Sequence, residues 1–224
     1  GTHLLALFPF RDSDAYMTGV RYFSQRATAA ESKLLNMKTA LLIVDVQNDF
    51  CPGGNLATAR GDEVASKIAE LVSNPDTRAR EYSHTLATQD WHIDPGDHFS
   101  EDPDFVDSWP VHCVADTHGA QIRGPVNTDY IDVFFRKGQY SAAYSGFEGK
   151  DENDQLLGDW LREHEIHTID VCGIATDHCV RATVLDAIKE GFNVRVLRSM
   201  CSPVDDKRGA QALEEMMNAG AELV

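Results

Sequence analysis

Cys179 is the residue of this chain that is best placed to do chemistry, because it stands where a predicted strand gives way to a predicted helix. The apolar run over residues 169–174 is typical of a strand, and apolar residues recur at helical spacing from Val180 onward. The first turn of a helix favours a thiolate through its free N–H groups and its positive dipole end. The sequence therefore predicts a nucleophilic thiol with oxyanion donors beside it. The structural alternative is a buried small apolar residue, as many single cysteines are.

Two charged residues follow other predicted strands. Asp45 ends the continuous apolar run over 40–44, which suits a parallel strand covered on both faces, and Lys137 follows the strand pattern over 131–136. Open α/β sheets place ligands at the carboxyl ends of their strands. Alone, an aspartate there is often a structural cap and a lysine is usually a surface charge. Together Asp45, Lys137 and Cys179 indicate a catalytic triad of base, cation and thiol.

Three motifs, taken in order along the chain, closely resemble a known family. They are DVQNDFC at 45–51, the segment around Lys137, and ATDHC at 175–179. This set resembles the nicotinamidase/pyrazinamidase branch of the isochorismatase-like cysteine hydrolases, from about residue 37 to the C-terminus. The resemblance implies that Asp45, Lys137 and Cys179 are catalytic. It also implies an oxyanion hole made by the backbone N–H groups of Ala175 and Cys179, with a cis peptide between Ile174 and Ala175.

Four further residues match the metal-binding pattern of that family. Asp90 and His92 are two residues apart, so on an extended chain their side chains point the same way and can share an ion. Any one of the histidines could instead form only a local hydrogen bond. The resemblance implies that one divalent Zn²⁺, Fe²⁺ or Mn²⁺ ion is held by Asp90, His92, His98 and His112. The histidines interpreted as surface or structural residues are His84, His118, His164 and His167.

Aromatic residues at the family's pocket positions complete the expected site. Phe50, Trp109 and Tyr144 could sandwich a flat ring, although ordinary packing explains them too, Tyr144 above all. The resemblance implies a small carboxamide substrate: nicotinamide, hydrolysed to nicotinate and ammonia in NAD salvage, with pyrazinamide accepted as an analogue. The ion would bind the ring nitrogen or polarise it through water. Two alternatives stay open: an amidase of this superfamily with a carbamoyl or ureido substrate, and a binding protein without turnover.

Composition limits the class of protein. The chain has 224 residues, of which 42% are hydrophobic and 25% charged, as expected for one globular domain with an ample core. A net charge of -16 argues against nucleic acid or an anionic membrane surface as a partner. No apolar run is long enough to span a bilayer, and a homo-oligomer stays open. The odd number of cysteines favours a reducing cytoplasm over a disulfide framework: Cys51, Cys113, Cys172, Cys179 and Cys201.

Strand and helix patterns alternate beyond Met37. This alternation predicts a three-layer α/β/α fold with a central, mainly parallel sheet. The long loop over 91–130 contains the expected metal ligands, which gives it a purpose. Strands are expected near 39–45, 84–89, 131–136, 168–174 and 193–198, helices near 62–73, 154–164, 178–190 and 206–218, and a last edge strand over 221–224.

Residues 1–36 form a separate segment without a motif, ahead of the predicted hydrolase domain over 37–224. Three interpretations compete for this extension: translation from an upstream artefact, a disordered extension, or a helix over about 15–35. We favour the first two. A signal peptide is not expected, because the apolar run over 4–10 is too short and weakly flanked.

Overall fold

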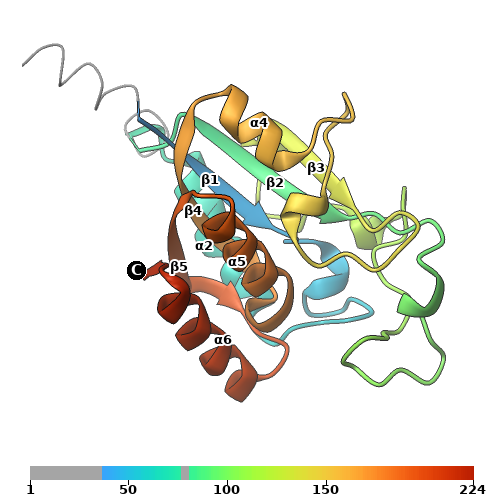
Figure 1. The fold of residues 1–224 in the computed structure, drawn as a ribbon. Coiled ribbons are helices and arrows are strands. Elements are labelled where there is room, and N and C mark those ends of the chain that lie inside the picture. Colours follow the sequence, from blue (N-terminus) through green and yellow to red (C-terminus); the bar gives the residue numbers. More distant parts are fainter. Residues whose placement is uncertain (1–36, 77–80) are drawn as a thin grey trace, which may run out of the picture. The chain divides into compact units, whose positions relative to one another are not determined.

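The computed structural model describes residues 37–76 and 81–224, so the expectations for residues 1–36 lie outside the described residues. In this part of the chain six strands form one sheet, and every pairing is parallel (Figure 1). Their order across the sheet is β3-β2-β1-β4-β5-β6. The strands are β1 (Lys38–Val44), β2 (His84–Asp90), β3 (Val133–Lys137), β4 (Ile166–Ile174), β5 (Asn193–Ser202) and β6 (Glu222–Leu223).

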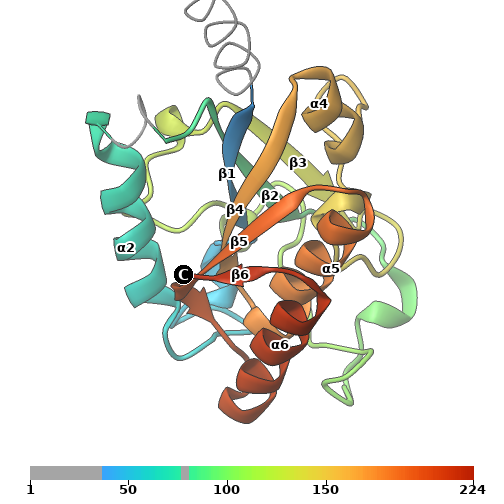
Figure 2. The same ribbon diagram turned by 60° about the vertical axis from the view of Figure 1, so that its left-hand side comes forward.

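Helices cover both faces of the sheet, which confirms the three-layer prediction. Figure 2 shows α2 (Gly61–Ser73) on one face and α5 (Arg181–Lys189) and α6 (Asp206–Ala219) on the other. The helix α4 (Leu157–Glu163) contributes to the same apolar cluster as α5 and α6. Strand β1 is buried on both sides, because its alternate residues enter the two clusters. No helix of the described residues is long and apolar enough to cross a membrane.

The order in which strands are added to the sheet reverses at its centre. From β1 it adds β2 and then β3 on one side, and it returns to place β4 on the other side of β1. The carboxyl ends of β1 and β4 therefore flank the topological switch point, where open α/β sheets bind their ligands. Asp45 directly follows β1 and Cys179 follows β4, so the topology brings the expected base and nucleophile to one place.

Element boundaries differ from the expected ones in ways that have local causes. The helix expected from 154 begins at Leu157, because the Asp151 carboxylate accepts the N–H groups of Asn153 and Gln155 in a turn. The helix expected from 178 begins only at Arg181. Between β4 and this helix lies a π-helical turn, η6 (Thr176–Val180), which contains Cys179.

The long loop after β2 contains three short 3-10 turns: η2 (Gly96–His98), η3 (His118–Ala120) and η4 (Thr128–Tyr130). A further turn, η1 (Asn48–Phe50), follows β1 and contacts η3. Backbone bonds tie the two segments together, since the N–H of Asn48 donates to the carbonyl of Gln121 at 2.9 Å. The loop is therefore anchored against the carboxyl end of the sheet.

Gly173 allows β1 and β4 to approach closely beside this switch point. Its φ is +126°, and a Cβ there would lie 2.1 Å from the carbonyl oxygen of Val44. Only glycine adopts such a backbone conformation without strain, and the neighbouring main chain cannot move aside. The close pairing of the two central strands therefore depends on this glycine.

We predict that Gly173→Ala lowers the free energy of unfolding by at least about 3 kcal/mol, through clash and backbone strain together. Urea unfolding followed by circular dichroism measures the loss. Gly191→Ala is the matched control, because Gly191 also has a positive φ (+94°) but no atom of the described residues lies within 4 Å of its added Cβ. That variant should lose only about 1 kcal/mol. Equal losses in the two variants would contradict the close-approach argument.

Candidate active site and metal centre

The buried ammonium of Lys137 lies at the centre of the expected triad. Its Nζ donates to Asp45 Oδ2 at 2.8 Å and also to Asp90 Oδ1. The same atom is 3.8 Å from the sulfur of Cys179. Lys137 and Asp45 have no exposed surface, and Cys179 is buried as well. The three residues that the sequence analysis grouped as base, cation and thiol are therefore in contact.

Asp45 is aimed into the site by its backbone and held there by a threonine. Its φ of +49° turns the chain out of β1 immediately after the strand ends. The hydroxyl of Thr88, on β2, donates to Asp45 Oδ1 at 2.7 Å and leaves Oδ2 for Lys137. Sequence reasoning missed Thr88. The available signal was its place two residues before Asp90, on the same side of an extended strand.

Burial dominates the electrostatics of the triad. It raises the pKa of Asp45, against the attraction of Lys137. It also raises the pKa of the Cys179 thiol well above its usual value, and the Lys137 ammonium only partly opposes this. For Lys137 itself burial acts the other way, but Asp45 and Asp90 outweigh it and hold the lysine pKa well above its usual range. The site thus pairs a permanently charged lysine with a carboxylate of increased proton affinity.

The expectation that the helix end favours a thiolate is therefore wrong in its direction. Cys179 does not stand on the first turn of α5 but in the π-helical turn before it, and it is buried, with 7% of its surface exposed. Burial disfavours the charged thiolate over the neutral thiol. Proton removal by a base becomes the means of activation.

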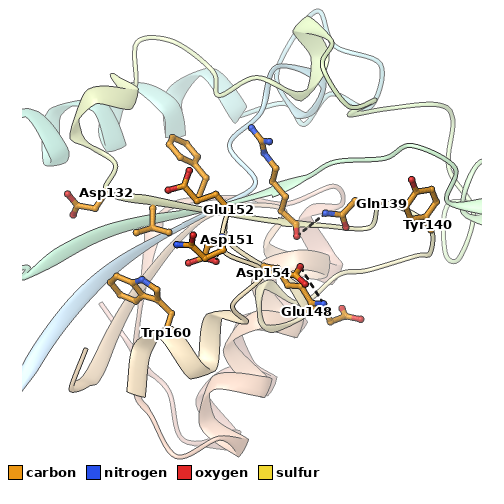
Figure 3. A pocket seen from close by; sticks show the side chains of 13 residues that line it. Asp132, Gln139, Tyr140, Glu148, Asp151, Glu152, Asp154 and Trp160 are labelled. Atoms are coloured by element: carbon orange, nitrogen blue, oxygen red, sulfur yellow. Dashed lines mark hydrogen bonds and ion pairs between the residues drawn. The ribbon is translucent and has the colours of Figure 1, made fainter. Parts of the chain in front are cut away.

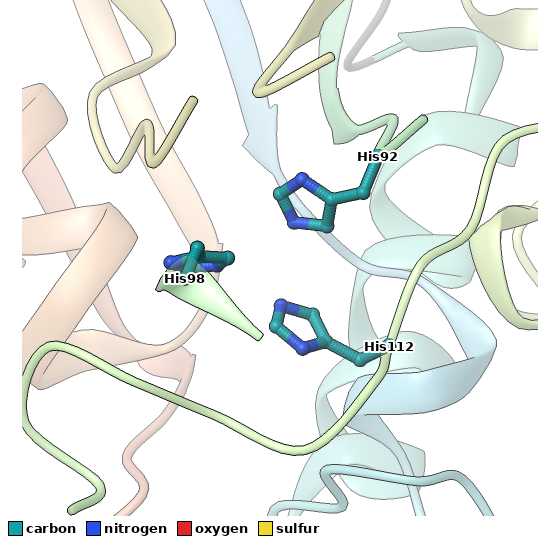
Figure 4. A group of neighbouring side chains, drawn as sticks. All are labelled: His92, His98 and His112. Atoms are coloured by element: carbon teal, nitrogen blue, oxygen red, sulfur yellow. The ribbon is translucent and has the colours of Figure 1, made fainter. Parts of the chain in front are cut away.

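Three imidazoles converge beside the triad, as Figure 4 shows for His92, His98 and His112. All three rings are buried, and one nitrogen of each lies within 4.8 Å of those of the other two. The Nδ1 atoms of His92 and His112 face the carbonyls of Gly138 (2.6 Å) and Pro110 (2.7 Å). These bonds leave the two Nε2 atoms as the ligating atoms, in the arrangement that metal-bound histidines usually have.

The hydrogen-bond inventory of these rings fits a bound cation. The Nε2 of His92 and both ring nitrogens of His98 are buried and have no hydrogen-bond partner within the described residues. Buried polar atoms are rarely left so, unless an ion or water satisfies them. Asp90 Oδ2 lies 3.5 Å from His92 Nε2 and 3.8 Å from His112 Nε2. Three imidazoles and a carboxylate are a donor set that suits a divalent transition-metal ion.

Asp90 belongs to both groups. One of its oxygens binds Lys137 and the other faces the imidazoles. Burial opposes its charge, but Lys137 and the two nearest imidazoles hold the pKa of Asp90 well below its usual value. A single carboxylate therefore joins the triad to the candidate metal site.

A small cavity of about 30 Å³ lies above Cys179 and is lined by the expected aromatic residues Phe50, Trp109 and Tyr144. The indole N–H of Trp109 donates to the hydroxyl of Tyr144 at 3.2 Å. Three further lining residues were not expected from the sequence: Leu56, His178 and Val204. Of these only His178, beside Cys179, had a sequence signal.

All the expected site residues meet at the carboxyl edge of the sheet. Ala175 lines the cavity beside Cys179, and the peptide between Ile174 and Ala175 is cis as expected. The four histidines interpreted as surface or structural residues lie elsewhere: His84 and His164 pack against Trp160, while His118 and His167 are exposed.

A larger cavity of about 720 Å³ lies outside this site, along β3 and the segment that follows it (Figure 3). Its polar lining mixes carboxylates such as Asp132 and Glu148 with the basic side chains of Arg136 and Lys150. It contains none of the expected site residues. The larger cavity is therefore not the candidate active site. The convergence of buried titratable groups identifies the smaller cavity as that site.

Comparisons with known proteins agree with this geometry. A family model described as the Isochorismatase domain matches residues 39–224. The nicotinamidase/pyrazinamidase of Mycobacterium tuberculosis is 50% identical over 185 residues, which cover 83% of this chain and 97% of that protein. The nicotinamidase of Escherichia coli is 37% identical and covers 82% of this chain and 93% of its own length.

Two solved structures extend the comparison to the fold. PnC1 of L. infantum, in complex with nicotinate, superposes with a TM-score of 0.72 at 31% identity and covers 84% of this chain and 93% of its own. The pyrazinamidase of Pyrococcus horikoshii, in complex with zinc, gives a TM-score of 0.70 at 36% identity, with 84% and 98% covered. The fold, the convergent site and these likenesses together show that the chain belongs to the isochorismatase family.

Proposed function

We propose that the protein is a metal-dependent nicotinamidase, a cysteine amidohydrolase that converts nicotinamide to nicotinate and ammonia. The observation that carries this proposal is the sharing of Asp90 between the Lys137–Asp45–Cys179 group and three buried imidazoles. Such an arrangement places a nucleophile and an ion-binding group on two sides of one small pocket. The named activities of the Mycobacterium tuberculosis and Escherichia coli relatives support the same reaction.

The proposed reaction uses the triad in two half-reactions. Asp45 removes the proton from Cys179, and the sulfur attacks the carboxamide carbon. The backbone N–H groups of Ala175 and Cys179 stabilise the tetrahedral oxyanion, at about 2.7–4 kcal/mol for each donor. Asp45 then returns the proton to the leaving nitrogen, so ammonia departs and a thioester remains. Water, deprotonated by Asp45, attacks the thioester carbon, and nicotinate leaves as the thiol regains its proton.

Lys137 keeps its charge throughout this sequence. It lies within hydrogen-bonding distance of Asp45 and 3.8 Å from the sulfur, so it stabilises negative charge on either atom as the proton moves between them. Asp45 needs appreciable proton affinity to act as a base, and burial provides it.

The proposed ion ligands are Asp90, His92, His98 and His112. When bound, the ion would supply a Lewis-acid site for the ring nitrogen of the substrate, directly or through water. Zn²⁺, Fe²⁺ and Mn²⁺ all suit these donors, and the zinc complex of the Pyrococcus horikoshii protein favours zinc. Gly138 supports the site, since its carbonyl fixes the tautomer of His92 and a Cβ at this position would lie 2.7 Å from that ring.

Phe50, Trp109 and Tyr144 are proposed to hold the flat ring, which makes pyrazinamide a second substrate. A carbamoyl or ureido compound is the alternative substrate, and the imidazole cluster argues against it because such compounds carry no ring nitrogen to position. A panel of these amides, assayed by ammonia release, distinguishes the two. We further propose that this reaction serves NAD salvage, as the family resemblance implies. We also propose a cytoplasmic location, since all five cysteines are free.

We predict that Cys179→Ala abolishes ammonia release from nicotinamide while the protein stays folded, because the change is small and only the nucleophile is lost. Iodoacetamide should inactivate the wild type by modifying Cys179, the thiol that lines the cavity. Cys201→Ala is the control and should keep activity, because Cys201 is buried outside the cavity. Measurable turnover by Cys179→Ala, or inactivation through another thiol, would remove Cys179 from this role.

The members of the triad should also act as one unit. We expect Asp45→Asn to lower kcat by a factor on the order of 10⁴, because the amide cannot accept the thiol proton. Lys137→Ala should lower it severely too, since it leaves two carboxylates unpaired. Adding Cys179→Ala to either variant should cause little further loss. Losses that multiply in the double variants would mean that the residues serve separate steps.

His98→Ala is predicted to lose the bound ion and nicotinamide turnover, because it removes a proposed ligand whose nitrogens have no hydrogen-bond partner in the described part of the chain. Metal content by elemental analysis should fall from about one ion per chain, as expected for a single four-ligand site. Cys179 should still react with iodoacetamide in this variant. His84→Ala serves as the control, since His84 packs on Trp160 away from the site. A His98→Ala protein with full metal content and activity would overturn the ligand assignment.

A further inference from the structure

The backbone ladder between β1 and β2 is interrupted where the site begins. It is regular as far as Val44, which pairs with Thr88, and the N–H of Asp45 still donates to the carbonyl of Thr88 at 3.2 Å. A regular parallel ladder would next bond the N–H of Asp90 to the carbonyl of Asp45, and the N–H of Gln47 to the carbonyl of Asp90. The positive φ of Asp45 turns the chain away, and its carbonyl accepts the N–H of Gln47 at 2.8 Å instead.

The side chain of Gln47 replaces both missing partners. Its Oε1 accepts the N–H of Asp90 at 3.0 Å, and its Nε2 donates to the carbonyl of Asp90 at 2.8 Å. A carboxamide carries the same donor and acceptor as a peptide group, so it completes the ladder in the place of the departed strand. Gln47 is fully buried, and its second amide hydrogen is donated to the carbonyl of Ala120 at 2.9 Å.

The bonds from Gln47 matter because Asp90 contacts both the triad and the proposed metal ligands. On its other edge the residue is held by β3, where it pairs with Lys137. Gln47 holds the edge that would otherwise be unpaired at the end of β1. With both edges fixed, the Asp90 carboxylate can direct one oxygen to Lys137 and the other toward His92 and His112.

We propose that Gln47 is a positioning residue that fixes Asp90, so that one carboxylate serves the triad and the metal ligands together. The inference rests on the proposed metal site. The inference goes beyond that metal site by assigning a role to a residue that is expected to touch neither ion nor substrate. Partners that orient ligands in this way typically change metal affinity or activity about 10–100-fold when removed.

Gln89 provides a matched control within the same strand. It is buried, and its Nε2 donates to the same carbonyl of Ala120 at 3.1 Å. Its Oε1 has no hydrogen-bond partner within residues 37–76 and 81–224, and no bond joins its side chain to Asp90 there. Replacing Gln89 removes the bond to Ala120 while leaving the main chain of Asp90 held.

The test compares Gln47→Met with Gln89→Met, since methionine has a similar length and fills irregular space. Zn²⁺ affinity of the metal-stripped proteins is measured by competition with a chromophoric chelator. We expect affinity to fall about 10–100-fold in Gln47→Met and less than about threefold in Gln89→Met. With Co²⁺ bound, the visible absorption bands should shift in Gln47→Met alone. At saturating Zn²⁺ its kcat for nicotinamide should stay below that of the wild type.

Equal Zn²⁺ affinities and Co²⁺ spectra in wild type and Gln47→Met would overturn the proposal, as would equal losses in both variants. If Gln47→Met does not fold, Gln47→Glu replaces it: this variant keeps the acceptor for Asp90 but loses the donor, and at least about tenfold weaker Zn²⁺ binding is expected. Wild-type affinity in that variant would overturn the proposal equally. A wild type that binds no Zn²⁺ would refute both proposals, whereas Zn²⁺ binding without ammonia release would refute the proposed function alone.

Discussion

The site depends on a buried ammonium held between two carboxylates. Lys137 has no exposed surface, and it bonds to Asp45 and Asp90 together. Removing such charges from water costs several kcal/mol for each ion, so none of the three is tolerable alone. With one positive and two negative charges the group keeps a net negative charge, which a divalent cation beside Asp90 would offset. The same triplet therefore sets the protonation of the triad and the preference of the adjoining site for a cation.

The fold brings this triplet together from separate strands. Asp45, Asp90 and Lys137 lie at or just beyond the carboxyl ends of β1, β2 and β3, which are neighbours in the sheet. Two side chains then fix the carboxylates. The Thr88 hydroxyl donates to the Asp45 carboxylate, and the Gln47 amide supplies the backbone hydrogen bonds that Asp90 lacks from β1. Thr88 belongs to β2, and Gln47 lies three residues beyond the end of β1, so both supports stand at or near the ends of central strands.

Much of this arrangement could be predicted from the sequence. Continuous apolar runs marked the central strands, and the charged or nucleophilic residues that followed them located the triad. The metal ligands were found through family resemblance, since spacing alone does not show that His98 and His112 return to Asp90 across a long loop. Leu56 and Val204 were missed, because an apolar residue in a loop carries no signal of the pocket that it lines.

Other features depended on three-dimensional context. The π-helical turn at Cys179 and the burial of that residue were not visible in a helical pattern, so the direction of its pKa shift was predicted wrongly. Gln47 stood in a recognised motif without an assigned role. Its role appears only when the register of β1 against β2 shows which backbone bonds are replaced.

The central claim is that the triad and the ion belong to one site joined by Asp90. Its most direct test is ammonia release from nicotinamide by wild-type protein that is stripped of metal and then reloaded in steps with Zn²⁺, Mn²⁺ or Fe²⁺. We expect almost no activity in the stripped protein, and a rise that saturates at about one ion per chain, as a single four-ligand site requires. Full activity without metal, or no ammonia release at any loading, would contradict it.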